Sequence, residues 1–247
     1  DYVSRMQKGQ KVIYYMAADS KKSAATAPFV EGLIKKDLEV FYLTEPTDEV
    51  SMANIGKYKD YEIADVSKDD ITLDEEDEKK KEEAAEEFKL LCDFIKKTLK
   101  DKIEKVTVSN RLTDSPCTVS TSKFGWSANM ERIMRNQPMQ DSRAAEYMRG
   151  KKIMEINPEH PLIKSLKEEI LANQESKKAK VISELLYETS LLTSGFMIDS
   201  PKTYAQKVYS MISKAVTKPS KAAKPQEKKE PELETVTPDA IEESKEN

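Results

Sequence analysis

Few side chains of this sequence could do chemistry, and none stands in a recognisable catalytic pattern. His160 is the only histidine, and it lies in the segment NPEHP. One histidine excludes metal sites built on a pair of histidines and leaves a single candidate general base. Because Asn and Pro are typical of helix starts, the segment favours a helix-capping role for His160 over a catalytic one.

The two cysteines add little to this search. Cys92 and Cys117 lie far apart and form no C-x-x-C motif, which indicates a reducing compartment rather than a disulfide scaffold. We interpret them as small apolar side chains, one in a helix and one in a strand. No G-x-S-x-G surrounds a serine, and the acidic residues lie in charged runs. We predict no catalytic residue and no metal in this chain; an enzyme using Cys117 or His160 is the alternative.

Composition and charge narrow the classes of partner. Of the 247 residues 35% are charged and 38% hydrophobic, with a formal net charge of −4. We therefore expect no nucleic-acid partner, because neutralising phosphates needs a basic surface. No apolar run approaches the roughly 20 residues of a membrane span, so we expect a soluble intracellular protein. The sequence begins at Asp1 without a visible targeting segment, and we expect a fragment that lacks its upstream part.

The elements that must position any site begin with a small α/β unit over residues 1–67. Strand and helix patterns alternate, which is the order of a parallel sheet with crossover helices. The unit contains no G-x-G-x-x-G and no P-loop, so we predict no nucleotide or other cofactor site in it. The expected strands are Lys11–Ala17, Leu38–Leu43 and Tyr61–Val66, and the expected helices are Lys21–Lys36 and Val50–Tyr58.

A second domain is predicted over residues 78–216, after the charged run Asp74–Glu87. It begins with a long helix, about Glu78–Leu99, and continues with three strands and further helices. The fold class is therefore α+β, with a small parallel-sheet unit followed by a mixed helix and three-strand domain. The Lys- and Glu-rich segment 217–247 has no aromatic residue and is predicted to be a disordered tail. The three strands are Lys105–Ser109, Cys117–Thr121 and Lys151–Ile156.

An apolar stripe stands out within the segment FGWSANMERIMRNQPMQ. Trp126, Met130, Ile133 and Met134 recur at i, i+4, i+7 and i+8, which is one face of a helix. Methionine is unbranched and polarizable, so such a face adapts to partners of many shapes. Two interpretations stay open here: a surface for unfolded or partly folded proteins, or a stripe that belongs to the hydrophobic core.

The last two predicted helices form a hairpin. The first, Ala179–Ser194, ends at Gly195, and the second starts at Ser200 with Pro201 in its first turn. The hairpin is apolar on more than one side, so pairing with a second copy would give a four-helix bundle. Packing within one chain is the alternative. The predicted interface residues are Leu185, Leu186, Leu192, Tyr204, Val208, Met211 and Ile212.

Several sequence blocks resemble the heat shock protein 90 chaperone family in their order and spacing. The resemblance covers Asp1 to about Val216, and it extends to the segments of the first unit, such as PFVEGLIKKDLEVFYLTEPTDE. The blocks of the second part are NRL, SPC, FGWSANMERIM, YMRGKK, EINPEHP and LLYETSLLTSGF.

The resemblance implies that residues 1–67 end a middle domain and that residues 78–216 form a C-terminal domain whose last helices make a homodimer. It implies that Trp126, Met130, Ile133 and Met134 contact client proteins. It places ATP, Mg²⁺ and ATP hydrolysis in an upstream domain of the parent chain, so this fragment is not expected to be an enzyme. A dimeric scaffold with the Trp/Met helix in its core remains the alternative.

The end of the sequence departs from two branches of that family. It has neither the Met-Glu-Glu-Val-Asp of cytosolic members nor the Lys-Asp-Glu-Leu of endoplasmic-reticulum members. Helical-repeat co-chaperones bind the Met-Glu-Glu-Val-Asp end in that family, so this departure argues against their recruitment, and other co-chaperones are left as candidate partners. The segments YMRGKK and DLEVFYL resemble the plastid branch. The resemblance thus implies a plastid or another organelle rather than the cytosol.

Overall fold

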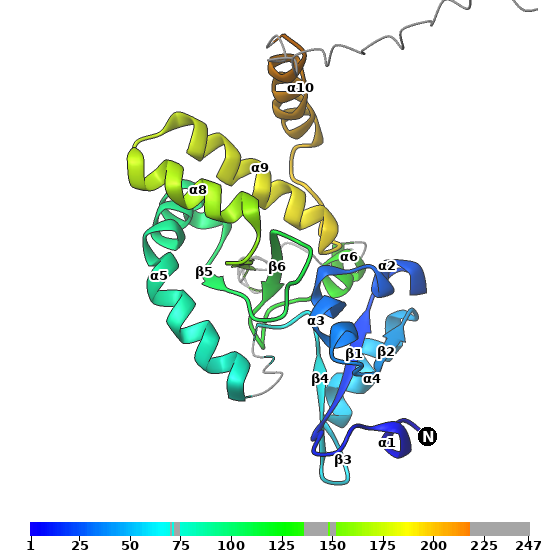
Figure 1. The fold of residues 1–247 in the computed structure, drawn as a ribbon. Helices are drawn as coiled ribbons and strands as arrows, with labels where there is room; N and C mark the ends of the chain where they lie inside the picture. Colours follow the sequence, from blue (N-terminus) through cyan, green and yellow to red (C-terminus); the bar gives the residue numbers. More distant parts are fainter. Residues whose placement is uncertain (70, 72–74, 136–147, 149–151, 218–247) are drawn as a thin grey trace, which may run out of the picture. The chain divides into compact units, whose positions relative to one another are not determined.

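The computed structural model describes residues 1–69, 71, 75–135, 148 and 152–217. Asp1–Val208 form one compact unit, and a second unit begins at Tyr209. Secondary structure is mixed, with helices packed on two small sheets (Figure 1). This agrees with the predicted α+β class. Residues 218–247 of the predicted tail lie outside the described residues.

The first sheet is built from residues 12–65. Its strands are β1 (Val12–Ala17), β2 (Val40–Leu43), β3 (Lys57–Tyr58) and β4 (Tyr61–Asp65), in the order β2-β1-β4-β3. β1 is parallel to both neighbours, with Tyr14 opposite Val40 and Val12 opposite Glu62. The short β3 pairs antiparallel with β4 and was not predicted. The preceding helix α4 spans Pro46–Ile55, earlier than the predicted range.

The predicted helix Lys21–Lys36 is wrong as a single element. The chain forms α2 (Lys21–Ala25), a 3₁₀ turn η1 (Pro28–Val30) and α3 (Glu31–Lys35) instead. Proline has no backbone N–H and disfavours helical geometry in the residue before it. Ala27 accordingly takes φ −69° and ψ 140°, which is extended. The break turns the apolar side chains after Pro28 onto β1, where they form the core beside the first sheet: Phe29, Val30 and Leu33 with Tyr14, Met16 and Val66.

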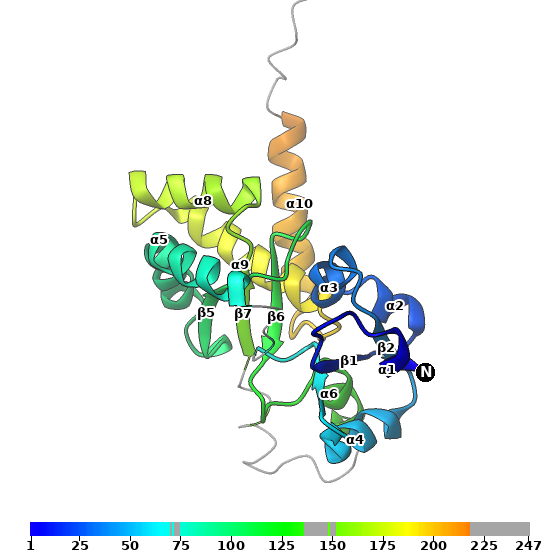
Figure 2. The ribbon, with the colours of Figure 1, turned by 60° about the horizontal axis from the view of Figure 1, so that its bottom comes forward.

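The second sheet has the strand order β5-β7-β6 (Figure 2). β5 (Lys105–Val108) runs parallel to the central β7 (Lys152–Ile156), and β6 (Cys117–Thr121) runs antiparallel to it. All five residues of β6 are buried. β6 is therefore covered on both faces, and the buried hydroxyl of Thr118 has a partner, with its Oγ1 2.9 Å from Ser194 Oγ.

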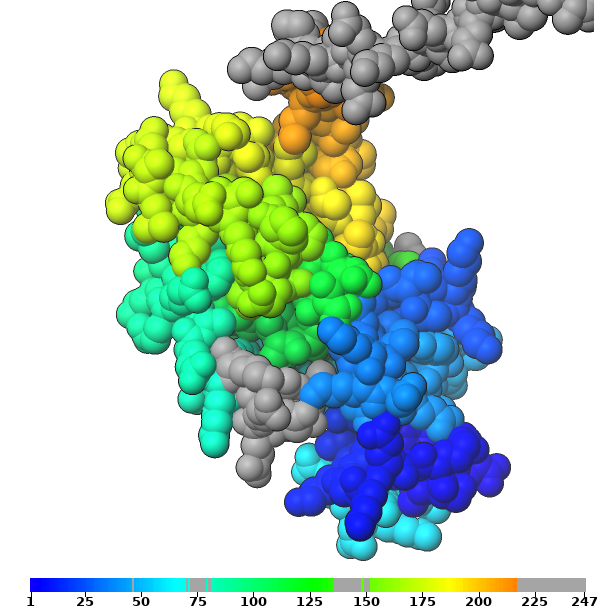
Figure 3. Space-filling model, in the orientation of Figure 1, coloured from blue at the N-terminus to red at the C-terminus, as the bar shows by residue number. Residues whose placement is uncertain are grey.

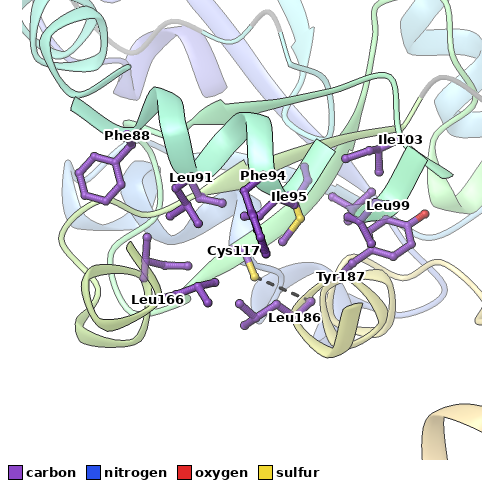
Figure 4. Packing of buried hydrophobic residues seen from close by; sticks show 14 of the residues in the cluster. Phe88, Leu91, Phe94, Ile95, Leu99, Ile103, Cys117, Leu166, Leu186 and Tyr187 are labelled. Atoms are coloured by element: carbon purple, nitrogen blue, oxygen red, sulfur yellow. Dashed lines mark hydrogen bonds between the residues drawn. The ribbon is translucent and has the colours of Figure 1, made fainter. Parts of the chain in front are cut away.

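Three helices pack on this sheet and on one another: α5 (Glu75–Leu99), α8 (Pro161–Ala172) and α9 (Lys177–Thr193). Figure 4 shows the side chains between them, with Phe88, Leu91 and Ile95 of α5 facing Leu166 and Leu186. This cluster is the main hydrophobic core and holds Cys117 at its centre. The last helix, α10, spans Pro201–Thr217.

Buried polar contacts join the two sheets within the unit Asp1–Val208. Arg111 pairs with Glu155 of β7 and donates to the carbonyl of Val66 at 2.6 Å. The Glu31 carboxylate accepts hydrogen bonds from the backbone N–H groups of residues 113, 114 and 115. Gly32 touches the Arg111 backbone so closely that a Cβ there would lie 2.6 Å from its carbonyl oxygen. In Figure 3 the surface of the first part of the chain, in blue, adjoins that of the middle part, in green.

Candidate partner-binding surface

The predicted Trp/Met helix exists, but it begins later than the sequence pattern predicts. Helix α6 spans Ala128–Arg135, so Trp126 lies before it rather than in its first turn. Ser127 is the reason, because its Oγ accepts a hydrogen bond from the N–H of Met130 at 3.1 Å and caps the helix. Met130, Ile133 and Met134 remain within the helix and keep the predicted spacing.

The buried side of α6 is its polar side. Asn129 is 7% exposed and Glu131 is 4% exposed, whereas Trp126, Met130, Ile133 and Met134 are all half-buried. None of these four is a member of either hydrophobic cluster among the described residues; Ala128 is the residue of α6 that packs on one. An amphipathic helix normally turns its apolar face inward. Here Asn129 and Glu131 are buried instead, Arg135 is exposed, and the apolar stripe is only half-buried.

Charged partners beneath α6 make the burial of Glu131 possible. Glu131 Oε2 lies 2.9 Å from Lys152 Nζ of the central strand β7, and Arg135 adds a second cation at 3.4 Å. The same Lys152 ammonium lies 4.9 Å above the ring of Phe196. Burying the Glu131 carboxylate would destabilise the fold without such partners. The cations of β7 and of α6 itself therefore stabilise α6 in this orientation.

Partners from the first sheet hold the other end of α6. Glu49 of α4 accepts hydrogen bonds from Ser127 Oγ at 2.5 Å and from Asn129 Nδ2 at 2.8 Å. Arg132 lies 3.4 Å from the carboxylate of Asp19, which follows β1. Sequence reasoning missed Glu49 and Asp19, because nothing in a single sequence shows that residues 80 and more positions apart meet.

Exposed apolar side chains mark the last helices as well. Of the predicted interface residues, Leu192, Met211 and Ile212 are 49%, 48% and 54% exposed, and Tyr204 and Val208 are half-buried. Leu185 and Leu186 are each only 8% exposed, and Leu186 belongs to the main core. A second copy could therefore bury little more of these two. Tyr209 and Val216, which the sequence analysis did not select, are 69% and 78% exposed.

Comparison with known proteins decides the family. The family described as Hsp90 protein matches residues 1–246. This chain belongs to the Hsp90 family. It is 51% identical over 216 residues to "Heat shock protein 90-5, chloroplastic" of Arabidopsis thaliana, which covers 87% of this chain and 28% of that protein. The resemblance proposed from the sequence is thereby confirmed.

Two further relatives support the assignment to the Hsp90 family. The chain is 42% identical to "Heat shock protein 90-6, mitochondrial" of Arabidopsis thaliana, over 88% of this chain and 27% of that protein. It is 47% identical to "Heat shock protein 83" of Leishmania donovani, over 86% of this chain and 47% of that protein. The chain thus spans between about a quarter and a half of the length of these relatives.

The residues suited to chemistry have structural roles in this Hsp90-family chain. His160 is the N-cap of α8, and its Nδ1 accepts a hydrogen bond from the N–H of Leu162 at 3.1 Å. Burial raises the pKa of the Cys117 thiol to about 11 and that of Cys92 to about 12, which disfavours the nucleophilic thiolate. The described residues hold no group of three His, Cys, Asp or Glu side chains that could bind a metal.

One cavity of about 460 Å³ adjoins α6. It is lined by the end of β1, by α2, by Asn129 and Arg132 of α6, and by residues 192–196. Its wall mixes hydroxyl groups with apolar side chains, and the Asp19–Arg132 ion pair supplies its charges. Among the helices of the described part of this Hsp90-family chain, none has the length and apolar character needed to cross a membrane.

Proposed function

We propose that this chain is the client-binding and dimer-forming part of a molecular chaperone. The observation that carries the proposal is the orientation of α6 in a chain of the Hsp90 family. Its Asn129 and Glu131 are buried against Glu49 and Lys152, and its Met- and Trp-rich stripe is left half-buried. Unfolded proteins expose apolar segments of varied shape, and flexible methionine side chains fit such segments.

The competing function is a dimeric scaffold that binds no client. That function needs the stripe in the protein core, where Trp126 and the two methionines would contribute stability instead. Partial exposure of all four stripe residues, together with their absence from the described core clusters, favours the chaperone. An enzyme based on Cys117 is disfavoured by the raised pKa of this thiol.

For dimerisation, we propose that α10 is the main contact and that α9 contributes its exposed side. The exposed Tyr209, Met211, Ile212 and Val216 supply an apolar surface on a helix that ends the described chain. Pairing of two such hairpins in a four-helix bundle buries on the order of 1,500 Å² in stable dimers. The proposed partners are thus a second copy, unfolded clients and co-chaperones.

The free energy for chaperone action would come from a longer protein that includes this chain. We propose that it binds ATP with Mg²⁺ and hydrolyses it in a domain outside this chain, and that this chain contributes no catalytic residue. Closure driven there would change the spacing of the two stripes across the dimer. The chloroplastic and mitochondrial names of two relatives favour an organellar location.

The test of client binding is the double variant Trp126→Ala, Met130→Ala. We expect a folded dimer that suppresses the aggregation of a heat-unfolding enzyme several-fold less than the wild type, because it has lost the larger part of the stripe. The matched control is Ile55→Ala, Leu171→Ala, which truncates two side chains that are 55% and 60% exposed on other helices. Unchanged suppression, or a loss of several kcal/mol in stability as in a core position, would support the scaffold instead.

A further inference from the structure

Helix α6 is held in place by polar side chains from elements that are distant in sequence. Glu49 receives two hydrogen bonds, from the capping Ser127 at 2.5 Å and from Asn129 at 2.8 Å. All three of these side chains are at most 7% exposed. The contact therefore lies beneath α6, and Glu49 is too buried to touch a client itself.

A carboxylate at this position is costly. Burial, and next the nearby charge of Asp65, raise the pKa of Glu49, while the hydrogen bonds from Ser127 and Asn129 lower it. A group whose pKa is raised on folding stabilises the fold at low pH and loses that contribution as the pH rises through its folded pKa. The charged form of Glu49 thus costs stability in this buried position, and its two hydrogen bonds offset that cost only in part.

The position of this costly group suggests its use. α6 follows β6 of the second sheet in the sequence. Glu49 and Asp19, however, come from segments that surround the first sheet. Ala128 is the residue of α6 packed on a described core cluster, so polar contacts carry most of the attachment. Hydrogen bonds are directional, so the position of α6 depends on where α4 holds the Glu49 carboxylate.

We propose that Glu49 is a positioning residue for the client-binding stripe, which ties the N-terminus of α6 to the first α/β unit so that this unit controls how the stripe is presented. The inference rests on the proposed function of the stripe. It gives α4 a role in client binding, although Glu49 of α4 is buried and does not contact the client. Loss of the tie would free Ser127 and Asn129 and loosen the first turn of α6.

The first experiment measures the attachment without any client, in the 247-residue chain. Glu49→Ala should lower the hydrogen-exchange protection of the amides of residues 128–135 by about tenfold or more, and it should change the emission of Trp126, the only tryptophan. Glu49→Gln keeps an acceptor for Asn129 and a donor for Ser127, so it should restore most of the protection. The control is Glu39→Ala, which removes an exposed ion pair with Arg5 in the same unit.

Unaltered protection of α6 in Glu49→Ala would overturn the inference. Should this variant fail to fold, Asn129→Ala removes the same contact from the side of α6 and must lower the protection in its place. Client assays then separate the two proposals. If Glu49→Ala loosens α6 and leaves aggregation suppression intact while Trp126→Ala, Met130→Ala impairs it, the positioning role is wrong. If neither variant affects suppression, the client-binding function is wrong.

A pH titration of Trp126 emission adds a measurement that would stay unchanged if Glu49 had a merely structural role. As the pH falls, the emission of Trp126 should change in the wild type, because Glu49, whose pKa is raised by burial, takes up a proton and then accepts one bond fewer. Glu49→Gln should abolish this transition, and an unchanged transition would count against the inference. The groups that face Glu49 are Asp65 of β4, Tyr15 of β1, Lys68 after β4, and Ser127 and Asn129 of the α6 side.

Discussion

At the scale of single residues, buried charges of this chain are paired across long sequence separations. Glu155 is 5% exposed and accepts from the guanidinium of Arg111, which is 2% exposed. Burial alone would raise the pKa of Glu155, but the Arg111 charge and hydrogen bonds outweigh it and lower this pKa. The pair also reaches the Val66 carbonyl, so it links the two sheets.

The pair predicts how Arg111→Met will behave. This variant leaves Glu155 buried without its cation, and we expect a loss of about 3–5 kcal/mol in the free energy of unfolding. The double variant Arg111→Met, Glu155→Gln should regain a large part of it. Because the folded pKa of Glu155 is lowered, its contribution exists above the unfolded pKa and fades as the pH falls through the folded one. Urea unfolding at several pH values measures all three effects; a single variant as stable as the double one would contradict the pairing argument.

At the scale of elements, the way in which α9 ends determines which side chain lies beneath α6. The N–H of Phe196 bonds to the carbonyl of Leu191 at 2.8 Å, and the N–H of Gly195 bonds to that of Leu192 at 3.1 Å. These are the two bonds of a Schellman motif, which needs a left-handed residue, and Gly195 has φ +84°. The motif brings Phe196 under Lys152, the cation that pairs with Glu131 of α6.

Gly195→Ala tests this helix stop. We expect a loss of about 1 kcal/mol or more, because alanine is strained at this φ and its Cβ would meet that of Ala128 at 3.4 Å. Gly9→Ala is the control, since Gly9 has φ +89° with no atom near a built Cβ. Urea midpoints compare the variants. Equal losses in both would show that packing against α6 contributes nothing beyond backbone strain.

Elements with a clear apolar period were predictable, whereas their breaks and orientations were not. The strand Cys117–Thr121 was predicted with its correct bounds. The helix predicted over 78–99 begins three residues earlier, at Glu75. The single helix predicted over Lys21–Lys36 overlooks the break at Pro28, which requires Ala27 to be extended. The stripe of α6 was found from its spacing. Its outward direction was not, because Glu49 and Lys152, which attract the polar face, lie far away in the sequence.

At the scale of the whole molecule, the proposed dimer determines where two client-binding stripes lie. Removing the chain from Ala179 onward would be a poor test of it, because Leu186, Tyr187 and Leu191 of α9 belong to the protomer's own core. Lys207 of α10 also pairs with Glu184 and Glu188 of α9, at 2.8 Å and 2.9 Å. Surface variants on α10 avoid this damage.

Met211→Glu, Ile212→Glu is therefore the sharper experiment. Both side chains are about half exposed, so the protomer should stay folded, while two carboxylates at an apolar contact should weaken the dimer by 100-fold or more. Light scattering at micromolar concentration should report a monomer. Leu171→Glu, Ile55→Glu places the same charges on other exposed positions and should leave the dimer intact. A dimer that survives the α10 variant would place the interface elsewhere, and the distance between the stripes would then depend on that surface instead of on α10.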